Sequence, residues 1–179
     1  MLENQSLRET ATRVRDLFVG NEIEHAIVSG VAVCLHGYRR NTVDLDLLVR
    51  SEDTAAIRTI LESDGFSGRE HQKQFCTASG AAVQFVLAGE SEGPGQPAVF
   101  PDPADARHLF RIEGLPVLSL AALIQSKLAC GLGNLRPTHK DFADVVELIA
   151  IHQLNKSFAR LLHKSVRAEF RELVRHAAG

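Results

Sequence analysis

Hydrophobic and polar residues recur with two different periods in the first half of the chain. Leu7, Val14, Leu17 and Phe18 are spaced as one face of a helix, so a helix is expected over residues 5–19. Short apolar runs predict strands at 25–28, 45–49, 75–77 and 82–87. Helices are expected at 30–35 and 52–63, between these strands. The alternation predicts an α/β fold in which helices flank a small mixed sheet.

The pattern changes in the second half of the chain. Residues 88–105 carry glycine and proline clusters and little periodicity, which predicts a long mobile loop that borders a site. A strand at 109–117 and helices at 119–130, 138–151 and 155–176 are expected to follow. We therefore expect an α/β core over residues 1–115 and a helical region over residues 116–179 that packs on it.

The composition is that of a globular protein with one ordinary core, because 45% of the 179 residues are hydrophobic. No run approaches the roughly 18 apolar residues that cross a membrane, and the N-terminus lacks a basic-then-apolar export pattern. We therefore expect a cytoplasmic protein with no membrane partner. Cys34, Cys76 and Cys130 lie far apart, without metal-ligand spacing, and are expected to be reduced thiols.

Two aspartates stand two residues apart at the start of the second predicted strand. Asp44 and Asp46 should project together, while Leu45 and Leu47 face the other side of the strand. Two converging carboxylates suit Mg²⁺ or Mn²⁺, which takes its remaining ligands from water and substrate phosphates. The pattern predicts a metal site for phosphoryl transfer. The alternative is the solvated face of a half-exposed strand.

The turn at Ser29-Gly30 joins the first predicted strand to a short helix. Its backbone N–H groups and the positive end of the helix are placed where an anionic phosphate could bind, and Ser29 could add a hydroxyl. Ser29 could equally cap the helix. At the other end of this helix, His36 could touch a substrate or stabilise the last carbonyl groups.

Residues on either side of the aspartates extend the candidate site. Arg40 can bind phosphate oxygens in a fork, and its alternation with Thr42 and the aspartates places it on the same side if the strand extends that far. Lys127 shares a helix face with Leu120, Leu123 and Ile124, so its ammonium should meet acids or a substrate phosphate, or reach the rim of the core.

Two acids follow on the next predicted helix. Asp144 and Asp141 are further candidates for the site. Their alternatives are local: Asp141 could cap the helix after Pro137, and Asp144 could pair with Lys140 one turn earlier.

In order along the chain, Ser29-Gly30, His36-Gly37 and Arg40-x-Thr42-x-Asp44-x-Asp46 resemble the minimal nucleotidyltransferase superfamily, whose fold is like that of DNA polymerase beta. The resemblance is strongest to its toxin-like AbiEii branch. Lys127 is similar to the third motif of that branch. Its fourth motif, an arginine followed by Lys-Asp-x-x-Asp, is matched by Arg136, Lys140, Asp141 and Asp144.

This resemblance implies transfer of a nucleoside monophosphate from a nucleoside triphosphate (NTP) to an acceptor on nucleic acid or protein, with Mg²⁺ or Mn²⁺. The implied catalytic residues are Asp44, Asp46, Lys127 and Asp144, the first two also binding the metal. The implied nucleotide contacts are Ser29, Gly30, Arg40, Thr42 and Lys127. The branch further implies a cognate antitoxin as partner.

Two positions depart from the family pattern. The phosphate turn usually begins with glycine, but here it begins with Ser29. A third acid is expected on the strand at 82–87, where the chain has Gln84, a neutral side chain that is a poor bridging ligand and a poor base. Glu90, Asp102 or Asp105 in the loop could substitute. The alternative function is therefore a catalytically degenerate protein that binds nucleotide or a partner without turnover.

Charge is concentrated at the C-terminus. From Leu154 onward the chain has six basic and two acidic residues, a net charge of +4, although the whole chain has −2. On one helix the basic residues would form a single stripe: Lys156, Arg160, Lys164, Arg167, Arg171 and Arg175. Such a stripe is either the solvent-exposed face of an amphipathic helix or a continuous binding surface, a track, for tRNA or another nucleic acid.

Overall fold

The computed structural model describes residues 5–68, 73–78, 80–134 and 140–177. Seven strands form one sheet: β1 (His25–Ile27), β2 (Asp44–Val49), β3 (Ser67–Gly68), β4 (Gln74–Cys76), β5 (Ala82–Leu87), β6 (Leu109–Ile112) and β7 (Leu115–Leu118). Their order is β3-β4-β5-β2-β1-β7-β6. β2 pairs with β5 and β1 with β7 in parallel, and the other neighbours are antiparallel. The predicted mixed sheet is confirmed.

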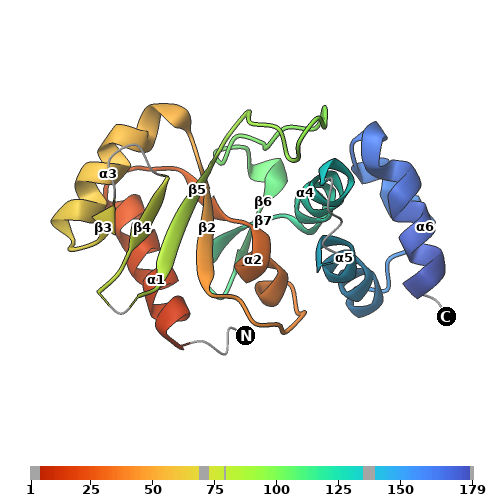
Figure 1. Cartoon of the computed structure of the whole chain (residues 1–179), viewed down its shortest axis with the longest axis horizontal. Coiled ribbons are helices and arrows are strands. Elements are labelled where there is room, and N and C mark those ends of the chain that lie inside the picture. Colours follow the sequence, from red (N-terminus) through yellow and green to blue (C-terminus); the bar gives the residue numbers. More distant parts are fainter. Residues whose placement is uncertain (1–4, 69–72, 79, 135–139, 178–179) are drawn as a thin grey trace.

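Within the described residues, six α-helices accompany the sheet: α1 (Gln5–Gly20), α2 (Ser29–Leu35), α3 (Thr54–Ser63), α4 (Leu120–Gly133), α5 (Lys140–Ile151) and α6 (Arg167–Ala177). Figure 1 shows α4, α5 and α6 gathered at one end of the molecule, next to α2, with α1 and α3 toward the other end. None of the helices within the described residues is long and apolar enough to span a membrane.

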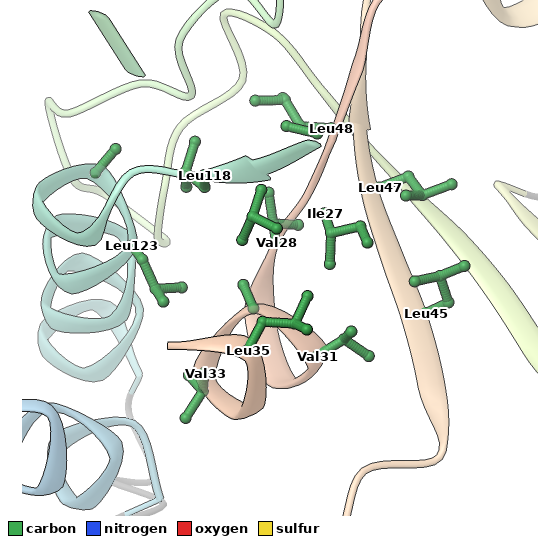
Figure 2. Close-up of a cluster of buried hydrophobic side chains, with 14 of the residues drawn as sticks. Ile27, Val28, Val31, Val33, Leu35, Leu45, Leu47, Leu48, Leu118 and Leu123 are labelled. Carbon is green, nitrogen blue, oxygen red and sulfur yellow. The ribbon is translucent and has the colours of Figure 1, made fainter. Parts of the chain in front are cut away.

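The two faces of the sheet meet different helices. Phe85 of β5 stacks on Phe18 of α1, with ring centroids 6.5 Å apart, and lies beside Leu47 in the strand register. Since side chains alternate along a strand, the residues directly before and after Leu47 must point to the face of the sheet opposite α1. Figure 2 shows Leu45 and Leu47 pointing away from α2, whereas Leu48 points to the other side of β2.

The short helix α2 is held by its apolar side chains. Val31 and Val33 are fully buried, and Figure 2 shows the side chains of α2 among those of β1, β7 and α4, including Leu118 and Leu123. Burying a side chain of this size contributes roughly 1.5–3 kcal/mol. Packing of this kind fixes where α2 begins, and the candidate site lies at that point.

Two predicted elements were wrong in extent. The expected strand at 109–117 is a hairpin of β6 and β7, because Glu113 and Gly114 both adopt positive φ (52° and 78°), as a tight hairpin turn requires. The expected helix at 155–176 is broken into two 3₁₀ turns, Lys156–Leu161 and Lys164–Val166, followed by α6. The short strand β3 was not predicted.

The break in the last predicted helix has a tertiary cause. Leu162 and His163 are extended (ψ 157° and 144°), which interrupts the helical hydrogen bonds. The N–H of His163 instead donates to the side chain of Gln125 on α4, at 2.7 Å. The proposed division of the chain after residue 115 stays a prediction, and β7 spans it.

Candidate functional site

The aspartate pair has the alternation that the sequence predicted. Asp44 and Asp46 are partly exposed, while Leu45 and Leu47 between and after them are buried. Burial raises the pKa of Asp46, and the charge of Asp44 adds to this rise, whereas a hydrogen bond from Ser29 and the charge of Lys127 oppose it. A carboxylate in this state gains from a nearby cation.

Ser29 connects the turn to the aspartates directly. It is the first residue of α2, its φ is 55°, and its side chain hydrogen-bonds to Asp46. The N-cap position belongs to Val28, which makes no side-chain cap, so the capping role considered for Ser29 is not formed. The N–H of Val28 also donates to the carbonyl of Asp46, at 3.0 Å. β1, the turn and β2 thus form one rigid unit.

Gly30 is required for a close approach. A Cβ at this position would lie 2.6 Å from Oγ1 of Thr42 and 3.1 Å from Nη2 of Arg40. The first turn of α2 therefore lies against both side chains that the sequence placed beside the aspartates, although β2 itself begins at Asp44 and Arg40 lies in the preceding loop.

Asp144 joins this turn to the helical region. Its carboxylate lies 2.8 Å from Nε of Arg40 and 2.9 Å from Nζ of Lys127, and it is 1% exposed. Lys127 also contacts Asp141 at 2.8 Å. Burial alone would lower the pKa of Lys127, but Asp144 and Asp141 raise it, so this buried ammonium stays charged.

These contacts decide between the alternatives left open by the sequence. Lys127 meets acids and does not reach the rim, and Asp144 pairs with Arg40 and Lys127 instead of Lys140. Arg136, which completed the fourth motif, lies outside the described residues. The residues just before α5, which Asp141 would contact as a helix cap, lie outside them as well.

Gln84, the residue at the expected third-acid position, lies beside the aspartate pair. β5 runs beside β2, and Gln84 lies directly opposite Asp46. The loop acids do not replace it. Glu90 pairs with Lys73, Asp102 with Arg50 and Asp105 with Arg107, so each loop acid already has a basic partner. Among the described residues, no group of three or more His, Cys, Asp or Glu side chains is arranged to hold a metal.

The loop at 88–105 packs on a different face of α4 from the one that carries Lys127. The Nε2 of Gln125 donates to Glu92 at 2.9 Å, and Gly93 and Pro94 lie against the backbone of Ala129 and Gly133. Glu92 is 1% exposed, and burial raises its pKa to about 7. Burial of Glu92 was not predicted, because the glycine- and proline-rich segment around it has no periodicity from which burial could be inferred.

His36 has a structural role. It is buried, its Nε2 lies 2.8 Å from the carbonyl of Leu118, and its own carbonyl lies 2.8 Å from Nε2 of His152. Burial lowers its pKa. It therefore links α2 to β7 and α5 and does not face the aspartates at the other end of α2.

The basic C-terminal residues do not form the predicted single stripe. Lys156, Arg160 and Lys164 lie on the 3₁₀ turns, and only the later three belong to α6. Arg167 is half-buried and donates to the carbonyl of Leu162 at 2.9 Å. The remaining five side chains are exposed. A continuous track along one helix is therefore excluded, and a more scattered basic surface remains.

No family model and no curated protein sequence matches the chain. It is similar to a crystal structure of ANT(2″)-Ia in complex with adenylyl-2″-tobramycin, at 18% sequence identity, over 94% of this chain and 98% of that chain, with a TM-score of 0.63. The same identity, 18%, relates it to TM1012, a protein of Thermotoga maritima, over 80% and 96% of the two chains, with a TM-score of 0.57.

A third similar structure is the lincosamide antibiotic adenylyltransferase LnuA in its lincomycin-bound form. It is 18% identical over 84% of this chain and 98% of that chain, with a TM-score of 0.55. These likenesses show that the chain has the fold of nucleotidyltransferases. These likenesses do not show the AbiEii branch.

Proposed function

We propose that the chain is a Mg²⁺-dependent nucleotidyltransferase, which transfers a nucleoside monophosphate from an NTP to an acceptor hydroxyl. The observation that carries the proposal is the placement of Asp44 and Asp46 on one face of β2, hydrogen-bonded through Ser29 to the start of α2. In the fold of nucleotidyltransferases, this arrangement places a carboxylate pair next to a turn whose backbone N–H groups can bind a phosphate.

Asp44 and Asp46 would hold Mg²⁺ or Mn²⁺. Their oxygens are the hard donors that these ions prefer, and two protein ligands leave room for triphosphate oxygens and water. The raised pKa of Asp46 fits, because a cation would relieve both its burial and its repulsion by Asp44. When bound, the metal would neutralise charge on the triphosphate.

The other residues would position the nucleotide. The backbone N–H groups of Ser29 and Gly30 would receive phosphate oxygens, with Thr42 and Arg40 at the outer side of the turn. Lys127 would offset charge that develops on the triphosphate. Asp144 would act through Lys127 and Arg40, since its carboxylate already binds both.

A degenerate protein that binds nucleotide or a partner without turnover is the second candidate. Gln84 favours it, because a neutral amide cannot accept the proton of an acceptor hydroxyl. In the described structure, each loop acid that could have replaced it is paired with a basic side chain, Lys73, Arg50 or Arg107. Under the first proposal, the proton would therefore leave to water.

The proposed acceptor and partners rest on features outside the aspartate pair. tRNA or another nucleic acid could use the exposed basic side chains Lys156, Arg160, Lys164, Arg171 and Arg175. A toxin-like role with a cognate antitoxin is supported by the motif resemblance alone. ANT(2″)-Ia and LnuA were captured with antibiotics, which favours small molecules as a second class of acceptor.

The test is transfer of label from each α-labelled NTP with Mg²⁺, in the presence of total tRNA, total protein or antibiotics. Wild type is compared with Asp44→Asn/Asp46→Asn and with Asp16→Asn, which alters an exposed aspartate of α1. Transfer by wild type and Asp16→Asn, but not by the double variant, supports the enzyme. Metal-dependent NTP binding without transfer supports the degenerate protein. If the wild type shows neither NTP binding nor transfer, the proposal is contradicted.

A further inference from the structure

A strip of uncharged polar side chains continues the site across the sheet. Asp46 of β2 lies opposite Gln84 of β5, and Gln84 lies opposite Gln74 of β4. Residues directly opposite on neighbouring strands point to the same face, so one carboxylate and two amides form a row. The adjacent row runs from Asp44 through Ala82 to Cys76.

This strip is open on the face where the aspartates lie. α2 packs against β2, β7 and α4, and α1 and the stacked Phe85 occupy the other face. Figure 1 shows β4 and β5 on the side of the sheet away from α4, α5 and α6. Gln74 is exposed and Gln84 partly exposed. In the described part of the chain, no other side chain engages either amide.

The strip also lacks charge. Among the described residues of β4 and β5, every side chain is neutral. The charge of the preceding Lys73 is paired with that of Glu90, which follows β5. From β4 and β5 themselves, a cationic group bound beside Gln84 and Gln74 would meet no acid, and an anionic group would meet no base.

We propose that Gln84 and Gln74 form the acceptor subsite and that it takes an uncharged, hydroxyl-rich small molecule. An amide presents both N–H donors and a carbonyl acceptor, and a hydroxyl group is likewise both donor and acceptor, so the two match without a net charge. The inference deepens the proposed transfer and rests on it, because it places the acceptor next to Asp46.

The step balances with the groups that the proposal names. The acceptor hydroxyl oxygen forms a bond to the α-phosphorus of the NTP, and the bond from that phosphorus to the pyrophosphate oxygen breaks. Pyrophosphate leaves, and the hydroxyl proton passes to water, since Gln84 cannot take it. The amides orient the acceptor and carry no proton.

Binding can be measured without turnover from the side-chain amide signals of Gln84 and Gln74 in nitrogen-15 NMR spectra. The probes are a panel of uncharged glycosides led by maltose, the polycation tobramycin, and total tRNA, each added with Mg²⁺ and a non-hydrolysable NTP analogue. We expect uncharged glycosides to shift both signals. Gln74→Ala should weaken their affinity roughly three- to ten-fold, the effect of one neutral hydrogen bond, while Gln5→Ala on α1 leaves it unchanged.

The inference is overturned if none of the uncharged compounds shifts these signals, if only tobramycin or tRNA does, or if Gln5→Ala and Gln74→Ala act alike. The proposed function is tested separately in the same spectra. Its readout is the shift of the backbone N–H signals of Asp44 and Asp46 on addition of Mg²⁺ and the analogue. Glycoside binding without that shift would retain the subsite and remove the nucleotidyl transfer. The reverse result would retain the transfer and remove this acceptor class.

Discussion

The guanidinium of Arg40 lies 2.8 Å from the carboxylate of Asp144, although 104 positions separate them in the chain. The same carboxylate binds Lys127 of α4. One buried acid therefore connects the loop before the aspartate pair to two helices of the helical region. Any movement of α5 should therefore displace Arg40. Because Gly30 lies against both Arg40 and Thr42, the displacement should also reach the first turn of α2.

Asp144→Asn should destabilise the protein strongly, because it leaves two buried cations without their shared charge. Removing one partner of a buried ion pair costs about 3–5 kcal/mol. Asp141→Asn is the matched control, since Asp141 contacts Lys127 alone and is more exposed. Urea unfolding should show a clearly smaller loss for it. Equal losses would mean that the pairing with Arg40 contributes nothing.

Gly30→Ala should disturb the site locally. The added methyl group would lie within 2.6 Å of Thr42, so that side chain and Arg40 must shift. We expect a cost of about 1–3 kcal/mol and a weaker affinity for Mg²⁺ and NTP together. Gly20→Ala is the control, because nothing lies within 4 Å of a Cβ there. Calorimetric titration of both variants gives the comparison, and equal affinities would remove Gly30 from the site.

Much of this site follows from sequence patterns, because each step depends on neighbours in the chain. Two-residue alternation placed Asp44 with Asp46, and helical spacing turned Lys127 toward the interior. Family resemblance pointed to Gln84 as the third position, and the strand register places this residue opposite Asp46. It also marked Ser29 as unusual. The structure gives a physical reason for glycine at that position, since its φ is 55°.

What the patterns missed depends on contacts between distant residues. The sequence predicted one helix over 155–176, because the basic residues from Lys156 to Arg175 are spaced like one helix face. The extended backbone at Leu162 and His163 is set by a hydrogen bond from the latter to Gln125, far away in the chain. Arg40 likewise showed no sign of its partner Asp144. Local periodicity carries no information of this kind.

The stability of the protein should fall as pH rises from about 4.5 to 7, in part because of Glu92. Burial raises the pKa of this carboxyl from 4.5 to about 7, so the folded state retains a proton that the unfolded state has lost. The favourable contribution is complete below pH 4.5 and is lost as pH rises through the folded pKa, by a total of about 3 kcal/mol. Above that pH, the folded state must hold a buried carboxylate.

Glu92→Gln should remove this part of the pH dependence, because the amide stays neutral and still offers an oxygen to Gln125. The check is urea unfolding at several pH values between 4 and 8, with Glu147→Gln on the exposed face of α5 as control. A slope that persists in Glu92→Gln at the size seen in the control would show that another group is responsible.

Gln84→Glu should tighten metal binding. It places a third carboxylate opposite Asp46, and hard anionic oxygens are the ligands that Mg²⁺ prefers. Without metal, the added negative charge should lower stability by about 1 kcal/mol through repulsion, and Mg²⁺ should reverse that loss. Melting temperatures with and without Mg²⁺, and calorimetric titration of the metal, measure both effects.

Gln74→Glu separates the effect of where the carboxylate lies from the effect of net charge alone. Gln74 lies one strand farther from Asp46, at a spacing of about 4.8 Å between strands, so a carboxylate there adds the same charge but should not reach the metal. If both variants tighten Mg²⁺ binding equally, the effect is that of net charge. If Gln84→Glu alone does so and also gains label transfer that wild type lacks, the missing acid is the cause of inactivity, and the degenerate function is assigned to a single side chain.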